Sequence, residues 1–186
     1  MGSVVEKGDE RDAGQVIANG GVFAAAALGY VLAPSPVWYA IGAGALAAST
    51  ADTWATEVGT LAGADPVSII SWQKVPPGTS GGVSLIGTAG GVGGALFISA
   101  VSAFANWPVP FTAVALGGLA GTLVDSLLGA TLQARRWCDV CSKSTERLVH
   151  SCGTKARHAG GLAGLDNDAV NSVCSGVGAL IALLLS

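Results

Sequence analysis

Three carboxylates stand out in the sequence because they lie in or beside long apolar stretches. No charged residue occurs between Asp12 and Asp52, and none occurs between Lys74 and Asp125. Glu57 follows shortly after Asp52. A carboxylate inside a membrane span is costly to desolvate, and it usually marks a functional site. The sequence therefore predicts a membrane protein with a buried acidic site.

Carboxylates in such a place could bind a divalent cation. Mg²⁺ prefers oxygen ligands and usually takes one or two protein carboxylates together with phosphate oxygens and water. Asp52, Asp125 and Asp168 are the predicted ligands. Acids alone would repel an anionic substrate, so a metal ion is their natural complement. The alternative is that Asp52 and Asp125 only form hydrogen bonds between helices.

The segment 74–84 could bind phosphate. Its candidate contacts are Lys74, Gly78, Thr79, Ser80, Gly81, Gly82 and Ser84. Glycines in front of a helix N-terminus let backbone N–H groups converge on an anion, which the helix dipole also favours. The pattern G-x-x-x-x-G-K-[ST] is absent, so this is not a Walker loop. The alternative is a glycine-rich turn that only leads into a membrane helix.

The segment 134–166 combines cysteines, histidines and basic residues. Cys138 and Cys141 form a CxxC pair, and His150, Cys152 and His158 follow. This spacing is typical of structural zinc sites, so Cys138, Cys141, Cys152 and one histidine, with His150 as the candidate, could staple an otherwise structureless loop. Unligated thiols are the alternative. The basic residues could meet phosphates or lipid headgroups equally well; they are Arg135, Arg136, Lys155 and Arg157.

The composition indicates the elements that must position these residues. Of 186 residues, 51% are hydrophobic and 11% are charged, whereas soluble domains carry about 25% charged residues. Residues 1–186 are therefore expected to form one all-α, membrane-embedded bundle, within which 134–166 is a loop. The 28 glycines lie mostly in apolar segments, which favours close helix packing in lipid. The predicted spans are 14–32, 37–61, 83–105, 109–133 and 167–185.

The basic residues predict the orientation of these spans. With five spans, the N-terminus and the long loops 62–82 and 134–166 share one face, and all nine lysines and arginines fall on it. The positive-inside rule makes that face cytoplasmic, in a protein of the cell membrane. The polar N-terminus predicts no cleavable signal peptide. The net charge of -3 says little about partners, and we expect no nucleic acid among them.

Polar residues gather in the cytoplasmic half of every predicted span. They are Asn19, Asp52, Thr53, Glu57, Ser84, Asp125, Ser126, Gln133, Asp166, Asn167, Asp168 and Asn171. Five segments thus place polar groups at one depth. This predicts a pocket that opens to the cytoplasm and is closed on its other side by the apolar part of the bundle. Asp52 and Glu57 diverge by about 140° on a helix. They cannot both face one centre unless the helix is distorted.

Five strings of the sequence, in order along nearly the whole chain, resemble the motifs of a known family. They are QVIANGG (15–21), ADTWATEVG (51–59), PGTSGGVSL (77–85), VDSLLGATLQ (124–133) and LDNDAVN (165–171). They resemble the integral membrane family that contains the plant and cyanobacterial phytyl-phosphate kinases and the transmembrane-protein-19-like proteins. Many of its members are longer, with additional N-terminal spans.

The resemblance implies a kinase that converts a prenyl monophosphate to its diphosphate, with a nucleoside triphosphate such as CTP as donor. Asp52, Asp125 and Asp168 would then hold Mg²⁺, with Glu57 as a further ligand or orienting group. Asn19, Asn167 and Asn171 would give polar support. These three, together with Ser126 and Gln133, would be contacts for the substrate or its phosphates. Lys74 and the loop 78–84 would cradle phosphates, with Arg135, Lys155 and Arg157 as further contacts.

Two other functions compete with the kinase. A transporter or lipid flippase could use intramembrane carboxylates to couple cations or protons. Such sites usually lie near the midplane between repeats, whereas the polar cluster here is one-sided and the sequence has no evident repeat. A non-catalytic membrane subunit is the third interpretation. In each case the lipid bilayer is a partner, and a homo-oligomer is compatible with the sequence.

Overall fold

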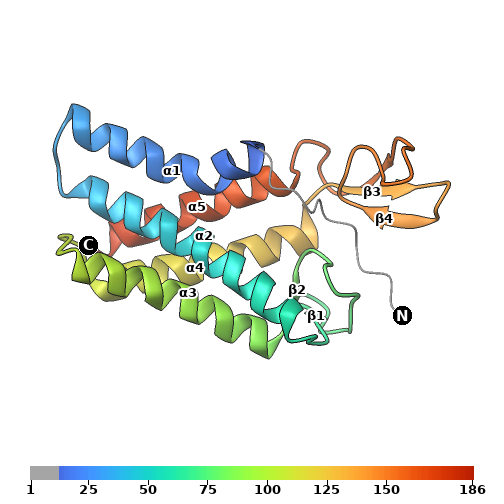
Figure 1. The fold of residues 1–186 in the computed structure, drawn as a ribbon, viewed down its shortest axis with the longest axis horizontal. Helices are drawn as coiled ribbons and strands as arrows, with labels where there is room; N and C mark the ends of the chain where they lie inside the picture. Colours follow the sequence, from blue (N-terminus) through green and yellow to red (C-terminus); the bar gives the residue numbers. More distant parts are fainter. Residues whose placement is uncertain (1–12) are drawn as a thin grey trace.

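Five apolar runs separated by proline turns and two polar loops form five α-helices (Figure 1). The computed structural model describes residues 13–186. The helices are α1 (Ala13–Leu32), α2 (Val37–Leu61), α3 (Leu85–Phe104), α4 (Phe111–Thr131) and α5 (Asn167–Leu184). All five predicted spans are confirmed as helices to within two residues at each end. The fourth is shorter at both ends than expected, partly because Pro110 is extended and lies just outside the helix.

Helix α2 runs through the middle of the bundle and contacts each of the other four described helices. Small residues allow this close packing. A Cβ at Gly87 of α3 would lie 2.7 Å from the carbonyl oxygen of Ala55, and one at Gly121 of α4 would lie 2.5 Å from the Cβ of Ala48. Any larger side chain there would push the helices apart. The prediction of glycine-mediated helix packing is confirmed.

Helices α1, α3, α4 and α5 are each long and apolar enough to cross a membrane. Helix α2 is more polar, and its central position explains how it tolerates this, because its neighbours shield it from lipid. Large hydrophobic side chains cover the outside of the bundle, including Leu96, Phe97 and Leu116. Such a surface suits lipid rather than water. The chain therefore folds as a polytopic helical membrane protein with about five spans.

The two polar loops form small antiparallel sheets. In the first loop, β1 (Val67–Ser68) pairs with β2 (Gly82–Val83). In the second loop, β3 (Arg135–Cys138) lies between β4 (Lys143–Thr145) and β5 (Arg157–Gly160). The segment 134–166, expected as a loop, therefore contains a three-stranded sheet. The strands are too short and too charged to show an alternating pattern, and they are defined by the turns between them.

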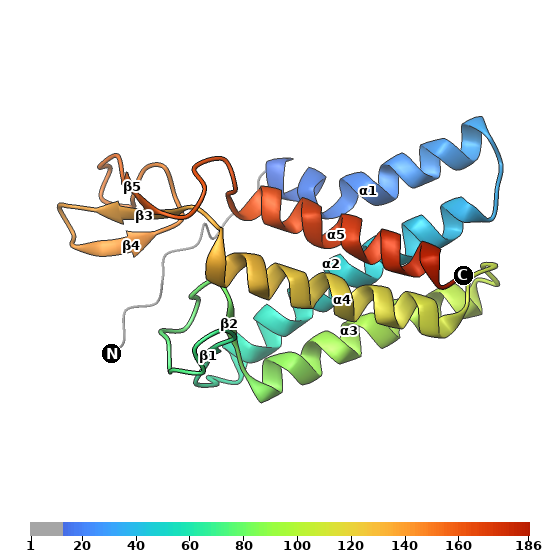
Figure 2. The same ribbon diagram turned by 180° about the vertical axis from the view of Figure 1, so that it is seen from behind.

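Both sheets lie at one end of the bundle, and the short turns lie at the other end with the C-terminus (Figures 1 and 2). Every lysine and arginine among residues 13–186 belongs to these two loops. Lys7 and Arg11, which the prediction assigned to the same face, lie outside the described residues. The described part of the chain thus has one basic end and one end without basic residues.

Candidate functional site

A cavity of about 630 Å³ opens at the end of the bundle that carries the sheets. Its walls come from α2, α3, α4, the first residue of α5, Gln133 and parts of the loop 62–84. The sequence predicted a pocket at this end, and its lining includes a large part of the predicted polar set. The predicted residues that line it are Asp52, Gly78, Thr79, Ser80, Gly81, Gly82, Ser84, Asp125, Ser126, Gln133 and Asn167.

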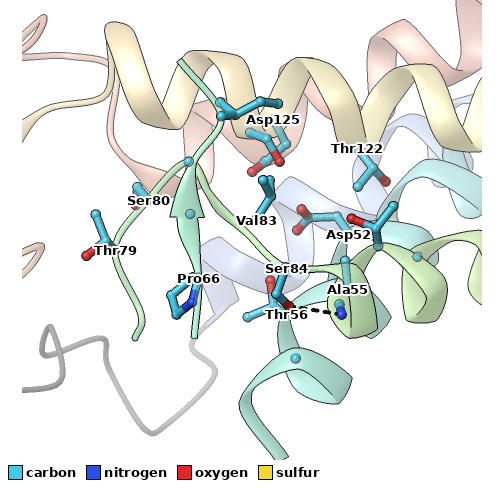
Figure 3. Close-up of a pocket in the computed structure, with 18 of the residues that line it drawn as sticks. Asp52, Ala55, Thr56, Pro66, Thr79, Ser80, Val83, Ser84, Thr122 and Asp125 are labelled. Atoms are coloured by element: carbon cyan, nitrogen blue, oxygen red, sulfur yellow. Dashed lines mark hydrogen bonds between the residues drawn. The ribbon is translucent and has the colours of Figure 1, made fainter. Parts of the chain in front are cut away.

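Asp52 and Asp125 face the same space from two different helices (Figure 3). Helix packing explains why. Helices α2 and α4 run in the same direction and touch at Ala48 and Gly121, and each aspartate follows its contact residue by one helical turn. Both side chains are half-buried, and Oδ2 of Asp125 is inaccessible to solvent. Two carboxylates held at one level, partly out of water, form a strong candidate cation site.

The glycine-rich segment folds over the end of α4. Gly78 and Gly81 have positive φ angles of 81° and 77°, which glycine adopts without strain. Gly81 also lies directly against α4, because a Cβ there would be 2.5 Å from the backbone nitrogen of Ala130. Only glycine satisfies both conditions at this position. The loop is thereby held beside Asp125 and Ser126, which line the same cavity.

The loop ends at the N-terminus of α3, where Ser84 is the N-cap. Its Oγ accepts a hydrogen bond from the backbone N–H of Gly87 at 3.1 Å, as an N-cap serine commonly does. The hydroxyl hydrogen of Ser84 is left to be donated elsewhere. Because Ser84 and Gly87 line the cavity, the positive end of the α3 dipole faces it. This is an environment that favours an anion.

The other two hydroxyls of the loop have partners within the protein. Thr79 donates to the carbonyl oxygen of Pro76 at 2.7 Å. Ser80 donates to a carboxylate oxygen of Glu146, which lies just beyond β4 in the second loop. These two hydroxyls therefore shape and anchor the loop. They are less suited to bind a ligand than the sequence suggested.

The start of α5 completes the cavity. Asp166 caps this helix, because its Oδ1 accepts a hydrogen bond from the backbone N–H of Ala169 at 3.0 Å. Asn167, at the first helical position, lines the cavity. Gln133 also lines it and is almost completely buried. Asp166 is thus a structural cap, whereas Asn167 is a candidate ligand contact.

Eight residues predicted for the catalytic or phosphate-binding site do not line the cavity in the described structure. They are Asn19, Glu57, Lys74, Arg135, Lys155, Arg157, Asp168 and Asn171. Glu57 is exposed, as its divergence from Asp52 along the helix requires. The ammonium group of Lys74 forms an exposed ion pair with Asp65 at 2.9 Å, and Arg157 forms one with Asp139 at 2.9 Å.

Asn19 takes part in a separate polar contact between helices. Its side chain donates to the carbonyl oxygen of Gln15 at 2.9 Å, and its backbone carbonyl accepts from Ser49 at 2.8 Å. Ser49 in turn shares a hydrogen bond of 2.7 Å with Ser175. These contacts join α1, α2 and α5. Asn19 therefore supports the packing of the bundle rather than the wall of the cavity.

Several hydroxyl residues that line the cavity were not predicted from the sequence. Thr56 and Thr60 continue the face of α2 that begins with Asp52, and Thr122 lies one turn before Asp125 on α4; all three line the cavity. The spacing of four residues between Asp52, Thr56 and Thr60 is the signal that could have identified them. Together they make the wall richer in oxygen atoms than the carboxylates alone.

A second cluster lies in the 134–166 sheet, away from the cavity. The ligand atoms of Cys138, Cys141, His150 and Cys152 all lie within 4.8 Å of one another. Hydrogen bonds from Thr154, and a further one from His150, lower the pKa of Cys152 to about 6. The hydrogen bond with Cys152, together with burial, raises the pKa of Cys141 to about 11. His158 is outside the cluster and contacts the carbonyl oxygen of Gly161.

Comparison with known proteins decides the family. A family model described as "Integral membrane protein DUF92" matches residues 1–179. The chain belongs to this family. The match covers the first four helices, both sheets and most of α5, and it confirms the membrane family that the motifs suggested.

Three curated relatives show how far the similarity reaches. The chain is 34% identical to Protein PGR of Arabidopsis thaliana over 145 residues, 70% of this chain and 48% of the relative. It is 36% identical to an uncharacterized membrane protein of Methanocaldococcus jannaschii over 101 residues, 53% of this chain and 42% of the relative. A Synechocystis uncharacterized membrane protein is 34% identical over 117 residues, with shares of 60% and 45%.

The chain thus spans about half the length of the curated relatives it matches. No solved structure matches it.

Proposed function

We propose that the protein is a phosphotransferase that moves the terminal phosphoryl group of a nucleoside triphosphate, such as CTP, onto a prenyl monophosphate. One observation carries the proposal. Asp52 and Asp125, on two different helices of a membrane bundle, line the same cavity as a glycine-rich loop at a helix N-terminus. The two carboxylates suit a cation, and the glycine-rich loop at the helix N-terminus suits phosphate. Phosphoryl transfer needs both.

The donor set of the cavity fits Mg²⁺. Asp52 and Asp125 supply carboxylate oxygens, and Thr56 and Ser126 add hydroxyl oxygens; Mg²⁺ binds such hard ligands while keeping water and phosphate oxygens in its coordination shell. Asp168 does not line the cavity, so we restrict the proposed protein ligands to Asp52 and Asp125. When bound, the metal ion would neutralise phosphate charge that the two carboxylates would otherwise repel.

The phosphate groups would lie between these carboxylates and the loop 78–84. Backbone N–H groups of the loop and the start of α3 are the proposed donors, with the hydroxyl hydrogen of Ser84 as a side-chain donor. Asn167 would contact a phosphate or ribose oxygen from the opposite wall. Lys74 is no longer part of the proposal, because its ammonium group is paired at the surface.

The prenyl chain requires an apolar path from the cavity to the bilayer. Val92 of α3 and Leu123 of α4 both line the cavity and are exposed to solvent. Leu119 of α4 adds a further apolar residue to the lining. We propose that the isoprenoid tail leaves the cavity between α3 and α4, so that the phosphate end stays at the polar mouth.

The reaction itself needs little from the protein beyond alignment. An oxygen of the prenyl monophosphate attacks the terminal phosphorus of the nucleotide, and the bond from that phosphorus to the nucleoside diphosphate breaks. The attacking oxygen is already ionised near neutral pH, so no general base is required. The loop and the two helices hold attacking and leaving oxygens in line, which is the main source of catalysis in such reactions.

The same proposal gives the orientation in the membrane. The basic end of the bundle, which also carries the cavity mouth, would face the cytoplasm by the positive-inside rule. Nucleoside triphosphates are supplied from that side. The N-terminus and both sheets would then be cytoplasmic, in a protein of the cell membrane.

The test is phosphoryl transfer by the purified protein in nanodiscs. We would supply Mg²⁺, CTP or ATP labelled on the terminal phosphate, and phytyl or geranylgeranyl monophosphate. The expected result is a labelled prenyl diphosphate that disappears in Asp125→Asn and persists in Asp65→Asn, a matched change of an exposed aspartate that does not line the cavity. Folded protein that gives no product with any acceptor, but moves lipid or solute in response to a proton gradient, would contradict the proposal and favour a transporter.

A further inference from the structure

We infer that the 134–166 sheet binds one zinc ion through Cys138, Cys141, His150 and Cys152, and that this metal centre supports the loop over the cavity. The centre is distinct from the proposed magnesium site and does not depend on the proposed activity. Three thiols and an imidazole are soft ligands that select zinc over magnesium. Four protein ligands leave no open position, so the site is structural.

Two tight turns bring the four ligands together. Cys138 ends β3, and Cys141 lies in the turn that follows, where Ser142 reverses the chain with a φ of 51°. The second turn carries His150 and Cys152. It is closed by hydrogen bonds from His150 N–H to the carbonyl of Thr154 at 2.9 Å and from Gly153 N–H to the carbonyl of His150 at 2.8 Å.

The distances match a tetrahedral metal site. The Sγ atoms of Cys138 and Cys152 are 3.6 Å apart. Two sulfurs bound to one zinc at about 2.3 Å would be separated by about 3.8 Å in a tetrahedron. A disulfide would instead require about 2.05 Å. The ring of His150 is held next to Cys152, whose backbone N–H donates to its Nδ1 at 3.3 Å.

The sheet also lacks a core that could hold it together without a metal. The buried residues from 134 to 166 are Ala134, Cys138, Thr145, His150 and Ala156. Two of these five are proposed ligands, and two others are alanines. Several of the larger hydrophobic side chains are exposed, including Val140, Leu148 and Leu162. Small units with so little apolar burial usually depend on a metal or on disulfides.

The sheet is connected to the cavity through Glu146. This residue follows β4, accepts a hydrogen bond from Ser80 through its side chain, and accepts another from Arg136 through its backbone carbonyl at 2.6 Å. Arg136 belongs to β3, two residues before the ligand Cys138. A metal ion that fixes the β3–β4 turn therefore also fixes Glu146, and with it the glycine-rich loop.

The first test measures metal in the full-length protein purified in detergent without added chelator. We expect about one zinc per chain by mass spectrometry, and Co²⁺ replacement should give the absorption of a tetrahedral thiolate site. Binding deprotonates the three thiols and releases their protons to solvent. Cys138→Ser should lose at least about tenfold in metal content, whereas Cys174→Ser, a buried cysteine in α5, should keep the full amount.

Two results would overturn the metal centre. One is wild-type protein that contains less than about a tenth of an equivalent of zinc and gives no tetrahedral Co²⁺ spectrum. The other is a Cys138–Cys152 disulfide found by mass mapping in protein kept under cytoplasm-like reducing conditions. If Cys138→Ser does not fold, Co²⁺ titration of chelator-treated wild-type protein tests the same site. A tetrahedral Co²⁺ spectrum would support the metal centre, and its absence would contradict it.

The second test addresses the link to the cavity. Hydrogen exchange is followed in segments 76–82 and 134–166 before and after zinc removal. We expect faster exchange in both segments, and we expect Glu146→Gln to speed exchange in 76–82 while it keeps its zinc. Faster exchange confined to 134–166 after zinc removal would show that the metal centre does not support the loop.

Discussion

The cavity and the cysteine sheet lie at the same end of the molecule but are built in opposite ways. The cavity is made by long helices whose small residues bring Asp52 and Asp125 to one level. The sheet is made by turns whose residues have almost no apolar core, and its ligands are sulfur atoms rather than oxygen atoms. Helix packing can hold a polar site in shape by itself, whereas we expect the small sheet to depend on its metal ion for stability.

The largest expected effect is the loss of phosphoryl transfer when a carboxylate of the cavity is changed. Asp52→Asn should lower phosphoryl transfer by about 10²–10³-fold, because it removes one of two charges that hold a cation against the phosphates. The bundle should keep its helical content, since the change preserves the shape of the side chain. The measurement is the initial rate of diphosphate formation in nanodiscs, with Asp65→Asn as control. Activity within about threefold of the wild type would remove Asp52 from the site.

Removal of zinc should affect the 134–166 sheet but leave the helical bundle unchanged. A chelator is expected to increase proteolytic cleavage within 134–166 by at least about tenfold, because the open form of the sheet becomes populated. The circular dichroism of the helices should not change. Loss of helical signal together with cleavage would show that the sheet and the bundle form one cooperative unit, and the contrast between them would fail.

A pair of glycine substitutions tests how closely the loop must approach α4. Gly81→Ala should destabilise the protein by about 1–3 kcal/mol, because the new methyl group would overlap Ala130 in a well-packed contact. Gly63→Ala is the matched control, since Gly63 also has a positive φ but has open space around it. Thermal unfolding in detergent gives both values. Equal losses would mean that the positive φ, and not the contact with α4, sets the cost.

The smallest effect is expected at Lys74. Its ion pair with Asp65 is almost fully exposed, and such pairs contribute about 0–1 kcal/mol. Lys74→Ala should therefore leave the KM for the nucleotide within about threefold of the wild-type value. A tenfold rise in KM would return Lys74 to the phosphate site that the sequence suggested.

The helices and much of the cavity could be predicted from the sequence because both depend on local patterns. Long uncharged runs set the spans, and the positions of Asp52, Asp125 and Asn167 within their spans set a common depth. Glu57 shows the limit of this reasoning. It shares a motif with Asp52, but helical geometry turns it away, as its exposure in the structure shows.

The parts that could not be predicted depend on contacts between distant segments. Nothing in the sequence connects Ser80 with Glu146, yet their hydrogen bond joins the two loops. The strands of the 134–166 sheet are equally hard to detect, because each has at most four residues and little apolar character. Only the spacing of its cysteines indicated that this segment has a defined structure.

The most direct test of the central claim is a comparison of wild type, Asp52→Asn, Asp125→Asn and the double variant in one nanodisc assay. If the two carboxylates act as a single cation and phosphate site, the wild type forms the prenyl diphosphate, each single variant loses about 10²–10³-fold, and the double variant loses little more than a single one. Losses that multiply, or wild-type protein that transfers no phosphoryl group, would contradict the account.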